Sequence, residues 1–269
     1  MPKAPLKVFD TQAAIGEYLA PVILDGIEKA RTSGRAFLLG CPTGRTPRPI
    51  YAAIARRVAA KRPDLGHLAL VMMDEYLART GSGFVYASST KPWTCHHFVD
   101  MEILGPWNRA LKESKRLRRD AIWFPDPRDP AAYDAKIADA GGVDFFILAS
   151  GASDGHVAFN PPGSPRDSRT RIIELSQETR RDNLLTFPEF GTLEQVPTHG
   201  VSVGIETIAS AKAKAMIVWG AGKRVTLDRI LSADRYEPNW PATVIHENTG
   251  GEIVADRDAA AHIQDRTSS

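Results

Sequence analysis

The chain has 269 residues, of which 43% are hydrophobic and 25% are charged, a composition that predicts a folded globular protein and excludes disorder as its main state. Its 34 Lys and Arg residues nearly balance 32 Asp and Glu residues, for a formal net charge of +2. This balance provides no basic excess for nucleic acid or an anionic membrane, and we expect neither as a partner.

The two cysteines are too few for a disulfide scaffold. No segment approaches the roughly 18 uninterrupted apolar residues of a membrane span, and no apolar signal-peptide region follows the N-terminal Lys and Pro residues. These features predict a cytoplasmic protein.

Strand-length apolar runs alternate with segments of helical periodicity. Most runs are continuous, which is typical of strands covered on both faces in a parallel sheet. The predicted strands are residues 36–41, 68–73, 121–124, 143–149, 215–219 and 242–245, and the predicted helices are residues 11–32, 49–61, 130–140 and 223–233. This order predicts the α/β class, as a three-layer α/β/α sandwich with a mostly parallel, Rossmann-like sheet. With no repeat and no linker, we expect residues 1–269 to form a single domain.

The loops after the predicted strands are the expected sites, because α/β sheets bind ligands beyond the carboxyl ends of their strands. After the first strand, Thr43, Gly44, Arg45 and Thr46 precede a helix, where backbone N–H groups, hydroxyls and the helix dipole favour an anion such as phosphate. An ordinary strand-to-helix turn explains these residues equally well. The Gly-Lys-Ser/Thr ending of a Walker loop is missing.

Two further loops carry candidate acid and base groups. Asp74 and Glu75 follow the second strand, with Asp74 the natural base, although surface or capping carboxylates fit the same pattern. Asp154 and His156 flank a glycine after the fourth strand, so that one tight loop presents both side chains and the carboxylate orients the imidazole. An incidental histidine in a turn is the alternative.

Several motifs in the same order resemble the glucosamine-6-phosphate deaminase/isomerase family, which shares its fold with the 6-phosphogluconolactonases. They are residues 39–47 (LGCPTGRTP), 73–76 (MDEY), 154–160 (DGHVAFN), 168–172 (SRTRI), 195–197 (QVP) and 220–223 (GAGK). The MDEY and AFN segments are more similar to the deaminases than to the lactonases, which have Asp-Glu-Arg and Ala-Ser-Leu-Phe-Pro there.

The resemblance implies a role for each candidate residue. Asp74 would move a proton between C2 and C1 of a sugar phosphate, and His156 with Asp154 would assist ring opening, because the ring oxygen needs an acid nearby. The phosphate would be held by the turn from Thr43 to Thr46 and by Arg180 and Lys223. The partner is then a small-molecule sugar phosphate, with no cofactor and no metal. The family includes monomers and larger assemblies, so a homo-oligomer stays open.

This sequence departs from the family pattern at three places. Pro161 stands where the deaminases have a glutamate that completes a relay with the aspartate and histidine. Either another carboxylate, such as Glu75 or Glu206, replaces it, or the ring-opening and amine-leaving steps differ. Arg45 replaces a second glycine and either adds a cation or blocks the phosphate site. Residues 91–98 (KPWTCHHF) replace a Ser- and Tyr-rich segment; their Cys and His residues suggest zinc, but adjacent histidines rarely converge on one ion.

Three functions fit these residues. The leading hypothesis is aldose–ketose isomerisation, with possible deamination, of an amino sugar phosphate. The alternatives are isomerisation or lactone hydrolysis of a different phosphorylated or anionic sugar without ammonia release, and a catalytically silent sugar-phosphate sensor. The prolines and charges of residues 160–190 predict a lid around Arg180.

Overall fold

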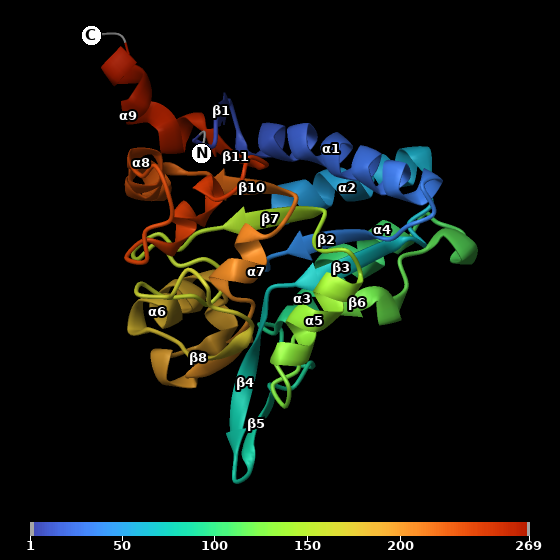
Figure 1. Cartoon of the computed structure of the whole chain (residues 1–269), viewed down its shortest axis with the longest axis horizontal. Coiled ribbons are helices and arrows are strands. Elements are labelled where there is room, and N and C mark those ends of the chain that lie inside the picture. The colour runs from blue at the N-terminus through green and yellow to red at the C-terminus, as the bar shows by residue number, and fades with distance from the viewer. Residues whose placement is uncertain (1–2, 268–269) are drawn as a thin grey trace.

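The computed structural model describes residues 3–267 and is built around a parallel sheet (Figure 1). The sheet has seven strands in the order β1-β11-β10-β7-β2-β3-β6. The continuous apolar runs form its central strands, which are buried on both faces. The strands are β1 (Leu6–Phe9), β2 (Phe37–Cys41), β3 (Leu68–Met72), β6 (Ile122–Trp123), β7 (Phe145–Ala149), β10 (Ala213–Val218) and β11 (Gly251–Asp256).

Helices cover both faces of this sheet, which confirms the predicted three layers. One face packs against α1 (Gln12–Thr32), α2 (Arg48–Lys61) and a continuous helical segment formed by α3 (Cys95–Phe98), a π-helix (Val99–Leu104) and α4 (Gly105–Asn108). The other face packs against α5 (Ala131–Asp139), α7 (Ile205–Ala209), α8 (Arg224–Ser232) and α9 (Arg257–Thr267). Among the helices described, none is both long and apolar enough to cross a bilayer.

A smaller antiparallel sheet, in the order β5-β4-β9-β8, extends from the carboxyl edge of the parallel sheet. Its strands are β4 (Asp74–Thr80), β5 (Gly83–Tyr86), β8 (Arg171–Glu174) and β9 (His199–Ser202). It shares a small apolar core with α6 (Gln177–Thr186), which begins where the Ser176 hydroxyl accepts a hydrogen bond from the Thr179 N–H. Met73 connects the two sheets, because β3 of the parallel sheet ends at Met72 and β4 of the antiparallel sheet begins at Asp74.

Five of the six predicted strands and all four predicted helices are confirmed within a few residues at their ends. The strand predicted at residues 242–245 is wrong: these residues lie in a 3₁₀ helix, Pro241–His246, and are fully buried. A short run buried on every side has no periodicity that separates strand from helix. The strand β5, which the sequence patterns also do not predict, pairs with β4 in a hairpin.

The strands β1, β4, β8, β9 and β11 were not expected from the sequence. β1 and β4 have mixed burial along their length, and β8 is half-buried, so none forms a continuous apolar run. The antiparallel sheet is consequently the largest feature of the fold that the periodicity did not predict.

Gly40 lies in β2, where the Phe146 ring of the neighbouring β7 packs directly over it. A Cβ at this position would lie 2.0 Å from a Phe146 ring carbon. We therefore expect Gly40→Ala to lower the free energy of unfolding by about 1–3 kcal/mol, because the fully buried ring has no free space to move into. Urea denaturation measures this change. Gly81→Ala is the matched control, since a Cβ there meets no atom within 4 Å, and equal stability loss in both variants would contradict the explanation.

Candidate active site

A cavity of about 220 Å³ lies beyond the carboxyl ends of β2, β3, β7 and β10. Seven of the nine predicted site residues line it: Thr43, Gly44, Arg45, Thr46, Asp74, His156 and Lys223. An eighth, Asp154, holds the His156 imidazole. The loops converge because parallel strands end at one edge of their sheet, as predicted.

The turn after β2 forms one wall of the cavity, and hydrogen bonds from two aromatic side chains hold its backbone. Gly44 has φ = 87°, a backbone conformation that favours glycine. The Tyr51 hydroxyl donates to the Pro42 carbonyl at 2.7 Å, and the Trp219 indole N–H donates to the Thr46 carbonyl at 3.0 Å. The turn is thus held rigidly at the start of α2, where the helix dipole favours an anion.

Two cationic side chains line the cavity at this turn: Arg45, which belongs to the turn, and Lys223. Arg45 is exposed, and Lys223, at the start of α8, is half-buried with its ammonium group donating to the Ser150 carbonyl. The pKa of Lys223 is lowered to about 8, mainly by burial and also by the charge of Arg45, against the opposing effect of the Asp182 and Asp154 carboxylates. The charge of Lys223 therefore depends on pH near neutrality.

Asp74 lies on the opposite wall, at the first residue of β4. Its side chain is nearly inaccessible, and the pKa of the carboxyl group is raised to about 7 by the balance of several effects, of which burial is the largest. The Cys95 thiol, which donates to Asp74 Oδ1 at 3.3 Å, and the nearby His156 partly offset this increase, whereas Glu75 adds to it. A carboxyl group with a pKa near neutrality is suited to both accepting and returning a proton.

The adjacent Glu75 points away from the cavity and is completely buried. Its two carboxylate oxygens accept hydrogen bonds from the backbone N–H groups of Tyr76, Cys95 and His96, at 2.7, 3.0 and 2.9 Å. Its Oε2 also lies 2.5 Å from His96 Nδ1. Glu75 thereby fixes the first turn of α3 against β4 and places Cys95 beside Asp74.

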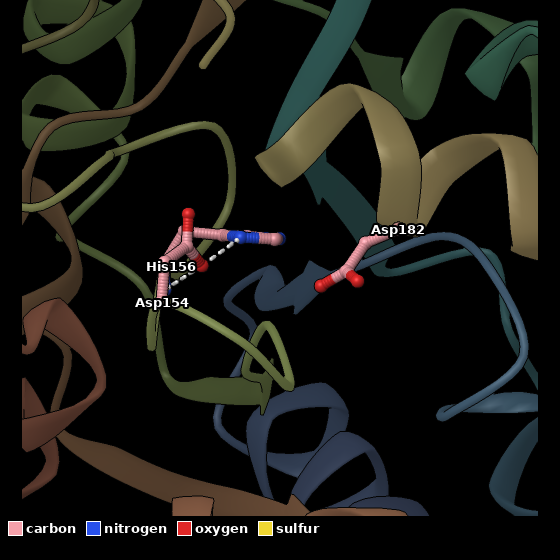
Figure 2. A group of neighbouring side chains, drawn as sticks. All are labelled: Asp154, His156 and Asp182. Atoms are coloured by element: carbon pink, nitrogen blue, oxygen red, sulfur yellow. Dashed lines mark hydrogen bonds and ion pairs between the residues drawn. The ribbon is translucent and has the colours of Figure 1, made fainter. Parts of the chain in front are cut away.

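His156 faces the cavity from the loop after β7, and Asp154 orients it. Asp154 Oδ1 lies 2.7 Å from His156 Nδ1 and also accepts the His156 backbone N–H at 3.1 Å (Figure 2). Burial opposes ionisation of Asp154, but its hydrogen bonds with His156 outweigh this effect and hold the carboxyl pKa below its usual value. The imidazole is consequently held by an ionised carboxylate on its Nδ1 side, leaving Nε2 for a ligand.

Arg180 is the one predicted site residue that the structure does not bring to the cavity. Its guanidinium group donates to the backbone carbonyls of Leu193 and Val196, at 2.5 and 3.1 Å. It thus ties α6 to the segment that follows it. The predicted lid segment nevertheless reaches the cavity, because Asp182, Asn183, Leu185 and Thr186 of α6 line it.

Two residues at the site were not identified from the sequence. Asp182 lies within a charged run of α6, and nothing in its local pattern separates it from solvent-facing neighbours. Cys95 was considered only as a metal ligand, but its thiol contacts Asp74 and Thr43 while His96 contacts Glu75. The signal for Cys95 was its place in a segment that departs from the family pattern.

Within the described part of the chain, one group of residues is spaced to hold a metal ion. It consists of Asp154, His156 and Asp182, whose candidate ligand atoms all lie within 4.8 Å of one another. In this group Asp154 Oδ1 and His156 Nδ1 are already hydrogen-bonded to each other. An ion would have to use the remaining carboxylate oxygens and His156 Nε2.

Removing the Glu75 carboxylate should destabilise the protein, because four donors around it would lose their acceptor. We expect Glu75→Ala to lower the free energy of unfolding by about 2–4 kcal/mol, measured by chemical denaturation. Glu178→Ala, which removes an exposed carboxylate paired with Arg181, should have little effect. A stable Glu75→Ala variant would show that α3 is held by other contacts.

Comparisons with known proteins agree with this arrangement. Residues 10–255 match the family described as glucosamine-6-phosphate isomerases/6-phosphogluconolactonase. The glucosamine-6-phosphate deaminase of Dictyostelium discoideum is 31% identical over 257 residues, which cover 94% of this chain and 91% of the relative. The glucosamine-6-phosphate isomerase of Candida albicans is 30% identical over 254 residues, covering 94% and 96%.

Solved structures show the same fold. A monomeric glucosamine-6-phosphate deaminase has a TM-score of 0.80 at 24% identity, covering 96% of this chain and 99% of that protein. The 6-phosphogluconolactonase of Leishmania guyanensis has a TM-score of 0.70 at 16% identity, covering 96% and 98%. The chain therefore belongs to the glucosamine-6-phosphate isomerase/6-phosphogluconolactonase family.

Proposed function

We propose that this protein is an enzyme that isomerises an amino sugar phosphate from aldose to ketose with release of ammonia, and that glucosamine 6-phosphate is its substrate. The observation that carries the proposal is Asp74: a buried carboxyl group with a pKa of about 7 faces a cavity that also contains a cationic anchor and an oriented histidine. Relatives bearing the names glucosamine-6-phosphate deaminase and isomerase support it.

The substrate phosphate would bind to the turn Thr43, Gly44, Arg45 and Thr46, with Lys223 supplying a second charge. Fixing one end of the sugar makes proton transfer at the other end effectively intramolecular. Arg45 then acts as an added cation at the rim of the cavity, where its exposed side chain leaves the turn open.

Asp74 would perform the proton transfer between the two carbons. As a carboxylate it removes the proton from C2 of the open-chain sugar, and as the resulting acid it returns the proton to C1. Because the neutral and ionised forms of Asp74 are close in free energy near pH 7, neither half of this transfer is strongly uphill at the base.

His156 would open the sugar ring before that transfer. Asp154 holds the Nδ1 side of its imidazole, so Nε2 is directed at the substrate and can supply a proton to the ring oxygen. Retention of this pair beside Asp74 supports a catalyst, because a protein that only binds a sugar phosphate requires neither group.

The test is ammonia and ketose production from glucosamine 6-phosphate by the purified protein. We expect Asp74→Asn to reduce kcat by about 10²- to 10⁴-fold, because the amide cannot accept a proton from carbon. Asp139→Asn, which changes an exposed carboxylate of α5, is the control and should retain full activity.

Other results of this assay would refute the proposal. Tight binding of the sugar phosphate without turnover would indicate the silent sensor, and hydrolysis of 6-phosphogluconolactone without ammonia release would indicate a lactonase. Full activity of Asp74→Asn would remove Asp74 as the base.

The pH dependence of kcat/KM should be bell-shaped. Asp74 must be deprotonated, so activity is lost as the pH falls through about 7, and Lys223 must be protonated to hold phosphate, so activity is lost as the pH rises through about 8.

Removing the thiol donor in Cys95→Ala should raise the Asp74 pKa and move the acidic limb upward by up to about one pH unit. Cys95→Ser, which keeps a donor, should leave the limb nearly unchanged, and an unmoved limb in Cys95→Ala would contradict this contact.

A further inference from the structure

Asp182 is a carboxylate at the cavity to which neither the sequence nor the proposed function assigns a role. It projects from α6, in the segment predicted as a lid, and lines the cavity together with Asp74. Its Oδ2 accepts hydrogen bonds from the Ala152 backbone N–H at 3.2 Å and the Ser153 hydroxyl at 3.4 Å. These contacts hold the side chain over the loop that carries His156.

Asp182 and His156 face each other across a narrow gap. The imidazole extends from Asp154 toward Asp182, and the Asp182 carboxylate points back toward the ring (Figure 2). The nearest candidate ligand atoms of the two residues lie within 4.8 Å, and no hydrogen bond joins them among the described contacts. Two groups this close can reach the ring oxygen and the C1 hydroxyl of one sugar, because both of these oxygens are bonded to C1.

Other carboxylates are less well placed to assist His156. Glu75 is fully buried and committed to the first turn of α3. Glu206 pairs with Arg166 and accepts from the Ser210 hydroxyl at 3.0 Å. Pro161, in the same loop as His156, carries no ionisable group.

We infer that Asp182 is a catalytic residue that acts with His156 in opening the sugar ring. This inference rests on the proposed function, since it concerns a step of the same reaction. It gives the site a second carboxylate beside His156, on α6, in addition to Asp154 in the loop after β7.

The step balances with these two residues alone. Protonated His156 gives its Nε2 proton to the ring oxygen as the bond between C1 and that oxygen breaks, and the electron pair of the bond stays on the ring oxygen. The proton of the C1 hydroxyl passes to the Asp182 carboxylate as the C1 carbonyl forms. Asp182 then returns this proton to His156, which restores both groups.

The experiment compares Asp182→Asn with Glu178→Gln, an exposed position one turn earlier on α6. Asparagine matches aspartate in size and keeps an acceptor for the Ala152 N–H, so the fold should be retained. We expect Asp182→Asn to reduce kcat for ammonia release from glucosamine 6-phosphate by about 10²-fold and Glu178→Gln to leave it unchanged.

Binding of 2-amino-2-deoxyglucitol 6-phosphate, measured calorimetrically, separates catalysis from recognition. This acyclic compound has no ring to open, so its Kd should change less than about twofold in Asp182→Asn. A large increase in Kd with kcat preserved would overturn the inference and make Asp182 a binding residue.

The remaining outcomes are equally distinct. Full kcat in Asp182→Asn, with an active wild-type protein, would overturn the inference and leave the proposed function intact. Absence of ammonia release from the wild-type protein would overturn both. Loss of wild-type activity with a chelator and its recovery with Zn²⁺ would show that Asp154, His156 and Asp182 hold an ion instead of relaying a proton.

Discussion

The buried carboxylate of Glu75 is the interaction on which the geometry of the site depends. Glu75 belongs to β4, whereas most of the groups that contact its carboxylate, the backbone N–H groups of Cys95 and His96 and the His96 imidazole, belong to the first turn of α3. Binding that turn brings the Cys95 thiol between Asp74 and Thr43. One carboxylate thereby ties together the antiparallel sheet, the helical segment beneath the parallel sheet and the turn proposed to bind phosphate. The two walls of the cavity that carry Asp74 and Thr43 are thereby connected through the Cys95 thiol.

The sequence predicted the site as far as backbone topology determines it. Continuous apolar runs such as residues 68–73 indicate strands of a parallel sheet, and the carboxyl ends of such strands necessarily meet at one edge. The polar residues of the loops after these strands, among them Thr43, Asp74 and His156, therefore had to converge. Lys223 follows β10 by the same rule, although the family resemblance was needed to identify it as a site residue.

What the sequence did not predict depends on contacts between segments distant along the chain. Arg180 was assigned to phosphate, but two backbone carbonyls of the segment after α6 take up its guanidinium group. Asp182, two residues further along, lines the cavity and accepts hydrogen bonds from the Ala152 N–H and the Ser153 hydroxyl, which belong to the loop after β7. That sheet itself pairs residues far apart in sequence, as in Asp74 with Ser202, and its strands lack the continuous apolar pattern that revealed the others.

The helix α6 contributes four residues to the cavity wall, yet only Thr179 among its ten residues is buried. Side chains in the core tolerate few exchanges, whereas exchanges on this helix cost the fold little. The two walls of the cavity thus differ in how closely they are tied to the core: one is formed by loops that directly extend buried strands, and the other by a largely exposed helix. A substitution on α6 can therefore change the lining of the cavity while leaving the packed core nearly unchanged.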